Sequence, residues 1–277
     1  MADTPAPTDR GAHPGVFVDQ GRPNPARVFS ALLGGKDTYS SDQIIAQRLL
    51  AINTFRVAIV EARLFLLRAV EHLVGDHGVT QIVELGCGYP NDPTVHEVAR
   101  NQTPTARTVY VDHDPIVAGH ARALMTGAGA VFVDADLTDP TDVLERIGSV
   151  LEPGLPTAVC LSGTAEFLPD APAIVASLTS LLPDGTWLVF TQTAADLRVH
   201  EIDSAVAIWA SAGISYRPRE REQVEQMLAP LRLLEPGVLT ADLWRPDLDI
   251  VGVEDGSQVW PKPVVCCYAA VGQLRRR

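Results

Sequence analysis

Short apolar runs alternate with helical patterns through the middle of the chain. Each run is rich in β-branched or aromatic residues, and the segment after it has apolar residues every three or four positions. We predict strands at 81–85, 108–112, 130–134, 157–162 and 186–192, and helices at 94–101, 115–126, 140–147 and 171–182. Strands and helices that alternate at this spacing predict an α/β fold, with a parallel sheet covered by helices on both faces.

The chain before the first strand carries helical periodicity and no strand pattern. A helix at 24–33 should end at Gly34-Gly35. A longer helical stretch follows, capped by Ser41 or Asp42; it should break near 52–54 and end before Gly75. We therefore divide the chain into a mobile tail at 1–20, a helical cap at 21–78 and a core at 79–277.

The pattern after the fifth strand is less regular. It predicts two more helices and two more strands, separated by a loop-rich segment. The helices are expected at 195–212 and 219–229, the strands at 231–235 and 264–272, and the loop at 236–262.

Charge and composition exclude several classes of function. The 277 residues include 34 acidic and 22 basic ones, for a net charge of −12, which disfavours binding to nucleic acid or anionic lipid. There is no signal-peptide core and no apolar stretch long enough for a membrane span, so we expect a soluble, cytoplasmic protein. The four cysteines form no CxxC pair and have no matching histidine spacing, so no metal site is expected.

Candidate chemistry gathers at the carboxyl ends of the first three strands, where α/β sheets bind ligands. The first strand ends in Glu84-Leu85-Gly86-Cys87-Gly88, a turn that lets the backbone approach a ligand. Asp112 ends the second strand and can accept both hydroxyl hydrogens of a ribose. Asp136 follows the third strand and could accept from the amine of adenine. The alternative is that both aspartates only cap the helices that follow them.

The turn is a poor match for a phosphate-bearing cofactor. A dinucleotide fingerprint would place a third glycine where Asn91 stands, with a helix N-terminus directly after it. Pro90 and Pro93 predict an extended segment there instead, and the chain has no P-loop motif. A nucleoside ligand without phosphate fits better, with Glu84 facing its amino group. S-adenosylmethionine is such a ligand, and NAD is disfavoured.

These segments together resemble class I S-adenosylmethionine-dependent methyltransferases, and more narrowly an S-adenosyl methyltransferase family abundant in actinobacteria. The resemblance covers about 20–272 and is carried by 23–43, 83–99, 109–124, 134–140 and 235–247. It implies a Rossmann-like, seven-stranded sheet, with the N-terminal helices and the Gly34-Gly35-Lys36-Asp37 loop over the cofactor. The implied cofactor residues are Glu84, Gly86, Gly88, Asp112, Asp136, Leu137, Ser162 and Gly163. We add His113, which directly follows Asp112, as a further cofactor candidate.

The acceptor side of the site is less defined. Glu166 follows the fourth strand, at a position where the family commonly has His, and we take Glu166 and Tyr39 as catalytic candidates. We expect the segment 23–42 to close over the cofactor, with Arg27, Gly35, Lys36 and Asp37 meeting its methionyl end or the acceptor. The alternative is a solvated turn at Lys36 and a simple helix cap at Asp42.

The predicted activity is methyl transfer to an unidentified small molecule. The fourth strand is not followed by [ND]PP[YF], which disfavours nitrogen methylation of DNA bases or glutamine. The alternative function is a non-catalytic regulatory protein that binds S-adenosylmethionine.

Overall fold

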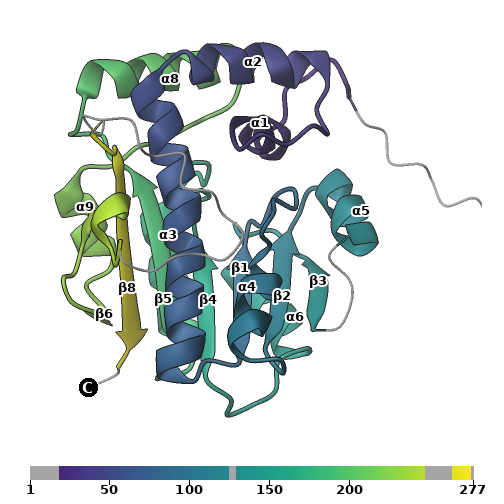
Figure 1. Ribbon diagram of the computed structural model, residues 1–277, viewed down its shortest axis with the longest axis vertical. Coiled ribbons are helices and arrows are strands. Elements are labelled where there is room, and N and C mark those ends of the chain that lie inside the picture. The colour runs from purple at the N-terminus through teal and green to yellow at the C-terminus, as the bar shows by residue number, and fades with distance from the viewer. Residues whose placement is uncertain (1–18, 125–128, 247–263, 276–277) are drawn as a thin grey trace, which may run out of the picture.

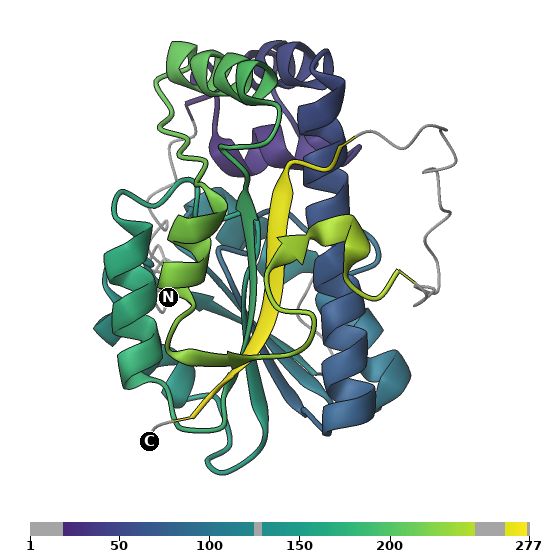
Figure 2. The same ribbon diagram turned by 90° about the vertical axis from the view of Figure 1, so that its left-hand side faces the viewer.

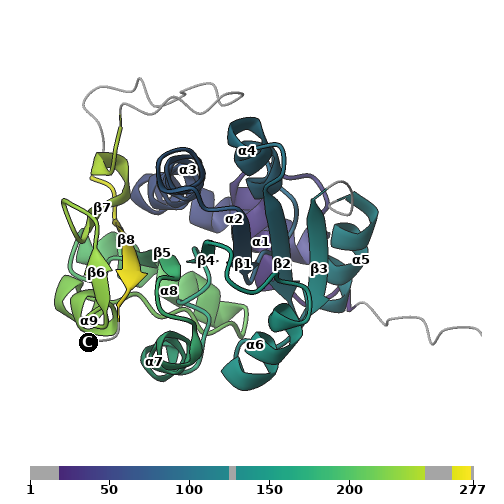
Figure 3. The same ribbon diagram turned by 90° about the horizontal axis from the view of Figure 1, so that it is seen from below.

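A computed structural model describes residues 19–124, 129–246 and 264–275. Its centre is an eight-stranded sheet in the order β3-β2-β1-β4-β5-β8-β6, with the short β7 also paired to β8 (Figures 1 and 3). The strands β1 to β5 are parallel, and β8 runs antiparallel to β5. The strands are β1 (Gln81–Leu85), β2 (Arg107–Asp112), β3 (Ala130–Asp134), β4 (Thr157–Leu161), β5 (Trp187–Thr193), β6 (Leu231–Leu233), β7 (Leu239–Thr240) and β8 (Cys267–Leu274).

Helices cover both faces of the sheet and one of its ends. Seen along the strands, α3 and α4 lie on one face and α6 and α7 on the other (Figure 3). Helices α1, α2 and α8 cross the end of the sheet where β1 to β5 finish (Figures 1 and 2). The helices are α1 (Pro25–Leu32), α2 (Ser40–Leu50), α3 (Asn53–His77), α4 (Val95–Gln102), α5 (Pro115–Leu124), α6 (Pro140–Gly148), α7 (Ala171–Leu181), α8 (Val199–Ser211), α9 (Arg221–Met227) and the short η1 (Ala241–Leu243).

The predicted α/β architecture is confirmed, and the structure corrects some boundaries. Helix α3 does not end before Gly75 but continues to His77, because Gly75 is exposed and the left-handed turn comes at Gly78, with φ of 64°. In the described part of the chain the sheet has eight strands rather than seven, since β7 forms inside the segment predicted as loop. The last strand begins at Cys267 rather than 264, and α8 begins at Val199 rather than 195.

Other predictions concern segments that are only partly described. Three parts of these predictions lie outside the described residues. They are residues 1–18 of the predicted tail, residues 247–262 of the predicted loop, and residues 125 and 126 at the end of the helix predicted at 115–126. Within the described part, no helix combines the length and the hydrophobicity needed to span a membrane.

Candidate functional site

A cavity of about 380 Å³ lies at the carboxyl ends of β1, β2 and β4. Helix α1 and the middle of α3 contribute its remaining walls through side chains such as Phe29 and Ile59. Its volume falls in the ~300–1,000 Å³ range of small-molecule sites. All nine residues predicted to bind the cofactor line this cavity: Glu84, Gly86, Gly88, Asp112, His113, Asp136, Leu137, Ser162 and Gly163.

The glycine turn after β1 is pinned to its neighbours. Gly86 and Gly88 have φ of 66° and 60°, values that other residues adopt with strain. The amide of Gly86 donates to the carbonyl of Val111 at 2.8 Å. A Cβ on Gly86 would come within 2.4 Å of the Thr164 side chain, so glycine is required there for packing as well. The turn therefore presents backbone atoms to the cavity at a fixed position.

Asp112 holds the glycine turn and does not cap the next helix. Its Oδ2 accepts from the amide of Gly88 at 2.9 Å and its Oδ1 from the amide of Asp114 at 3.0 Å. Asp114 caps α5 instead, with its Oδ1 2.7 Å from the amide of Ile116. Burial raises the pKa of Asp112, and the two amide bonds offset part of that rise. Each oxygen keeps a second lone pair that a ligand hydroxyl could use.

Asp136 and His113 lie at the outer rim of the cavity. Asp136 is exposed, and its side chain accepts from the amide of Thr138 at 2.9 Å, which lowers its pKa. The cap of α6 is Asp139, so Asp136 is not a helix cap either. The His113 side chain is 70 % exposed, with its Nδ1 3.9 Å from Asp112 Oδ1. Leu137, in the loop between β3 and α6, is buried and gives this rim an apolar surface.

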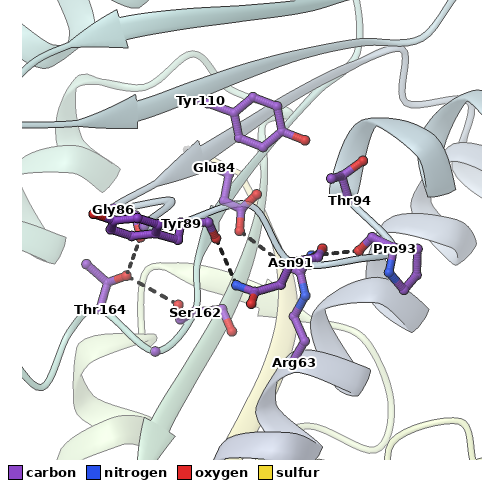
Figure 4. Close-up of polar contacts among 12 residues, drawn as sticks. Arg63, Glu84, Gly86, Tyr89, Asn91, Pro93, Thr94, Tyr110, Ser162 and Thr164 are labelled. Carbon is purple, nitrogen blue, oxygen red and sulfur yellow. Dashed lines mark hydrogen bonds and ion pairs between the residues drawn. The ribbon is translucent and has the colours of Figure 1, made fainter. Parts of the chain in front are cut away.

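Glu84 faces a guanidinium that the sequence analysis did not select. Arg63 extends from α3 toward the end of β1, with its Nη1 3.4 Å from Glu84 Oε1 (Figure 4). Burial raises the pKa of Glu84 to about 6, against the opposing effect of Arg63. A positive charge within an apolar stretch of α3 is the signal that could have pointed to Arg63.

Helix α1 contributes further residues that the sequence analysis missed. Asn24 and Phe29 line the cavity, and the Asn24 amide group donates to Asp114 Oδ2 at the start of α5. The Phe29 ring packs edge-on against Phe167, with centroids 6.1 Å apart. Helix α1 thus spans the cavity from α5 to the segment after β4. Tyr89 is a further lining residue, and burial raises its pKa to about 12, so its phenol stays protonated.

The two catalytic candidates are not among the residues that line the cavity. Glu166 is only 2 % exposed, and its Oε1 accepts from the amide of Thr193 at 2.6 Å, beneath the end of β5. Its side chain is turned into the protein, toward β5. Tyr39 precedes α2, where its ring stacks with the Arg27 guanidinium, 5.0 Å from ring centroid to Cζ.

The predicted substrate residues of the cap also lie away from the cavity lining. Arg27 is buried and its Nε donates to Asp42 Oδ2 at 2.6 Å, which ties α1 to α2. Gly35 packs against Ser30, whose Oγ would lie 2.1 Å from an added Cβ. Lys36 and Asp37 are exposed. The structure therefore brings α1 to the cavity but not the four residues Arg27, Gly35, Lys36 and Asp37.

The geometry agrees with comparisons to known proteins. A family model described as S-adenosyl methyltransferase matches residues 12–274. The chain belongs to this family. A DUF574 family protein from Streptomyces avermitilis is 28 % identical, with a TM-score of 0.82 over 93 % of this chain and 99 % of that one.

A predicted methyltransferase from Thermobifida fusca is 31 % identical, also with a TM-score of 0.82, over 96 % of this chain and 100 % of that one. No curated protein matches the sequence. Membership of the S-adenosyl methyltransferase family establishes S-adenosylmethionine as the cofactor.

The cavity residues fit the chemistry of this cofactor. Its amino-acid part is a zwitterion, and the cavity wall holds a carboxylate and a guanidinium side by side at Glu84 and Arg63. The Nε of Arg63 is buried without a hydrogen-bond partner in the described part of the chain, which leaves donor capacity unused. Asp112 retains acceptor capacity for ribose hydroxyls. No arrangement of His, Cys, Asp and Glu that could hold a metal occurs among the described residues.

Proposed function

We propose that this methyltransferase transfers the methyl group of S-adenosylmethionine to a small-molecule acceptor held under α1. The observation that carries the proposal is the walled cavity of about 380 Å³ at the strand ends. The net charge of −12 supports a small acceptor over a nucleic acid, whose phosphates it would repel.

The cofactor would be held by the residues at the ends of β1 to β3. Asp112 would accept from the ribose hydroxyls, Glu84 would face the ammonium group, and Leu137 with Asp136 would border the base. The cofactor supplies a methyl group on a sulfonium, activated for direct transfer. The protein's contribution is to align an acceptor with that group and to exclude water.

The walls contributed by the helices are suited to excluding water. Apolar side chains of α1, α3 and the segment after β4 line this part: Phe29, Leu33, Ile59, Leu66, Phe167 and Leu168. Within the described lining, the side chains that can take up a proton lie instead on the glycine turn and at the ends of β1 to β3. An acceptor against the apolar wall would therefore react by alignment, with little help from a base.

The alternative is a regulatory protein that binds the cofactor without turnover. It is supported by the position of Glu166 and Tyr39, neither of which lines the cavity. The two functions differ in whether S-adenosylhomocysteine is released continuously in the presence of an acceptor.

The proposal is tested by incubating the protein and S-adenosylmethionine with panels of small hydroxyl, amine and carbon acceptors. Mass spectrometry would follow S-adenosylhomocysteine and the methylated product. We expect at least one acceptor class to raise release above the acceptor-free rate, and the Asp112→Ala variant to lose that rise. Tight cofactor binding with no turnover across all panels would favour the regulatory alternative.

A further inference from the structure

Arg63 is a cavity-lining cation whose donors are only partly used. Its Nη2 donates to two backbone carbonyls, that of Asn91 at 3.0 Å and that of Pro93 at 2.7 Å (Figure 4). Its Nη1 lies 3.4 Å from Glu84 Oε1, longer than the ~2.7–2.9 Å of a closed ion pair. Its Nε has no partner among the described residues. A guanidinium has five N–H donors, and within the described residues three of those of Arg63 are directed at acceptors.

Other cations near α1 are either committed elsewhere or outside the cavity. Arg27 is paired with Asp42 at 2.6 Å and donates to the carbonyl of Arg22, so its charge is already compensated. Lys36 is exposed and is not part of the lining. Among the described residues that line the cavity, Arg63 is the only lysine or arginine.

We propose that Arg63 binds the α-carboxylate of the cofactor's methionyl group, while the neighbouring Glu84 takes its ammonium group. A buried charge is tolerated when an opposite charge with hydrogen-bonding capacity meets it. The pair of Arg63 and Glu84 offers both charges to a zwitterion, so ligand binding leaves no charge unmatched. Because Nη1 and Oε1 do not form a close ion pair, both atoms can interact with a ligand while Nη2 keeps its two carbonyl bonds.

Arg63 also braces the segment after the glycine turn through Asn91 and Pro93. A merely structural role would affect the binding of any ligand at this site. Recognition of a carboxylate would instead affect only ligands that carry one. A ligand series separates the two roles without reference to any acceptor.

The experiment measures dissociation constants by calorimetry for S-adenosylhomocysteine and for its decarboxylated analogue, with the intact protein and the Arg63→Gln variant. For S-adenosylhomocysteine, the variant should weaken binding at least tenfold. For the decarboxylated analogue, the two proteins should agree within about threefold, since the lost partner is absent from the ligand. Arg63→Lys should recover part of the loss, because it restores the charge without the planar fork.

Two measurements keep the result interpretable. Binding of 5′-methylthioadenosine, which lacks the whole amino-acid part, should be unchanged in Arg63→Gln and reports that the site is intact. Arg56→Gln removes an exposed positive charge from the same helix and should alter no constant. An equal loss for S-adenosylhomocysteine and its decarboxylated analogue would overturn the proposal in favour of bracing. An unchanged constant for S-adenosylhomocysteine would overturn it as well.

Discussion

Two buried glutamates, Glu84 and Glu166, occupy contrasting regions of this protein. Glu84 lies next to the last residue of β1, Glu166 follows β4, and burial raises the pKa of both. Glu84 lines the cavity and faces Arg63 at 3.4 Å. Glu166 belongs to a sealed cluster, in which Thr193 donates to it and Tyr216 and Arg219 lie nearby. Among the described residues its Oε2 has no hydrogen-bond partner, and Glu166 does not line the cavity that Glu84 lines.

The contrast shows what a shifted pKa alone leaves open. Desolvation makes either carboxylate costly in the folded protein, whatever its role. At Glu84 a cationic ligand group can offset that cost, because Glu84 lines the cavity and Glu166 does not. A carboxyl group with a shifted pKa therefore indicates a functional site only where a ligand can also reach that group. Substitutions at the cavity should therefore change ligand affinity, whereas substitutions around Glu166 should change the stability of the fold.

The largest effect is expected at Asp112, in the open region. Asp112→Ala removes a charged acceptor for two ribose hydroxyls and releases the amide of Gly88. Calorimetry should show that the free energy of S-adenosylhomocysteine binding becomes less favourable by about 2–4 kcal/mol. The control is Asp134→Ala, which removes an exposed carboxylate from the register-paired residue of β3. Equal binding by the Asp112 variant and the intact protein would refute the ribose assignment.

The sealed region should respond in the opposite way. Glu166→Ala leaves the buried amide of Thr193 without its acceptor and removes a charge that favours the nearby buried Arg219. The free energy of unfolding in urea should fall by about 2–3 kcal/mol, while the folded variant binds S-adenosylhomocysteine unchanged. Glu166→Gln keeps an acceptor for Thr193 and should cost less. If the variant stays fully stable but no longer binds the ligand, Glu166 contributes to the ligand site and the structural assignment is wrong.

The strand-end residues could be predicted because local sequence determines them. A short apolar run followed by glycines or an aspartate identifies both the strand and the place where it ends, as at Gly86, Gly88 and Asp112. All nine of these cofactor candidates line one cavity. The end of α3 was missed because an exposed Gly75 costs only about 1 kcal/mol, which packing elsewhere along α3 outweighs.

Side-chain direction and helix packing were harder to predict. Arg63 and Phe29 come more than 20 residues before the glycine turn, and only tertiary packing of α1 and α3 brings them to the cavity. Glu166 was selected because it follows β4, but sequence does not determine which way a side chain turns after a strand ends. Lys36 stood out as a rare lysine, yet it is exposed.

A smaller effect is expected from Glu84, whose replacement should raise rather than lower the stability of the ligand-free protein. Its pKa is about 6 in the folded protein and 4.5 in the reference state, so the folded protein binds the proton more tightly. This acid therefore destabilises the fold as pH rises from about 4.5 to 6, by about 2 kcal/mol in total. In the ligand-free protein, Glu84→Gln should be more stable than the intact chain at pH 7, with the gain vanishing near pH 4.5.

The same variant should bind S-adenosylhomocysteine more weakly at pH 7, because the amide no longer attracts an ammonium group. Unfolding in urea at several pH values, beside calorimetry at pH 7, measures both quantities. Loss of stability at pH 7 would show that Glu84 contributes to the fold in the way predicted for Glu166, and the contrast between the two regions would fail.

The smallest effect concerns α1, which covers the open region. Phe29 lines the cavity and packs on Phe167, and its ring reaches within 3.0 Å of where a Cβ on Gly163 would lie. Phe29→Ala should open this wall to water and weaken S-adenosylhomocysteine binding about tenfold, or 1.4 kcal/mol. Lys36→Ala is the matched control on the loop after α1, and its exposed side chain predicts no change. Calorimetry on both variants decides which part of the cap closes the site. The reverse result, a loss with Lys36→Ala alone, would mean that the Gly34-Gly35-Lys36-Asp37 loop reaches the ligand and that α1 only packs against the core.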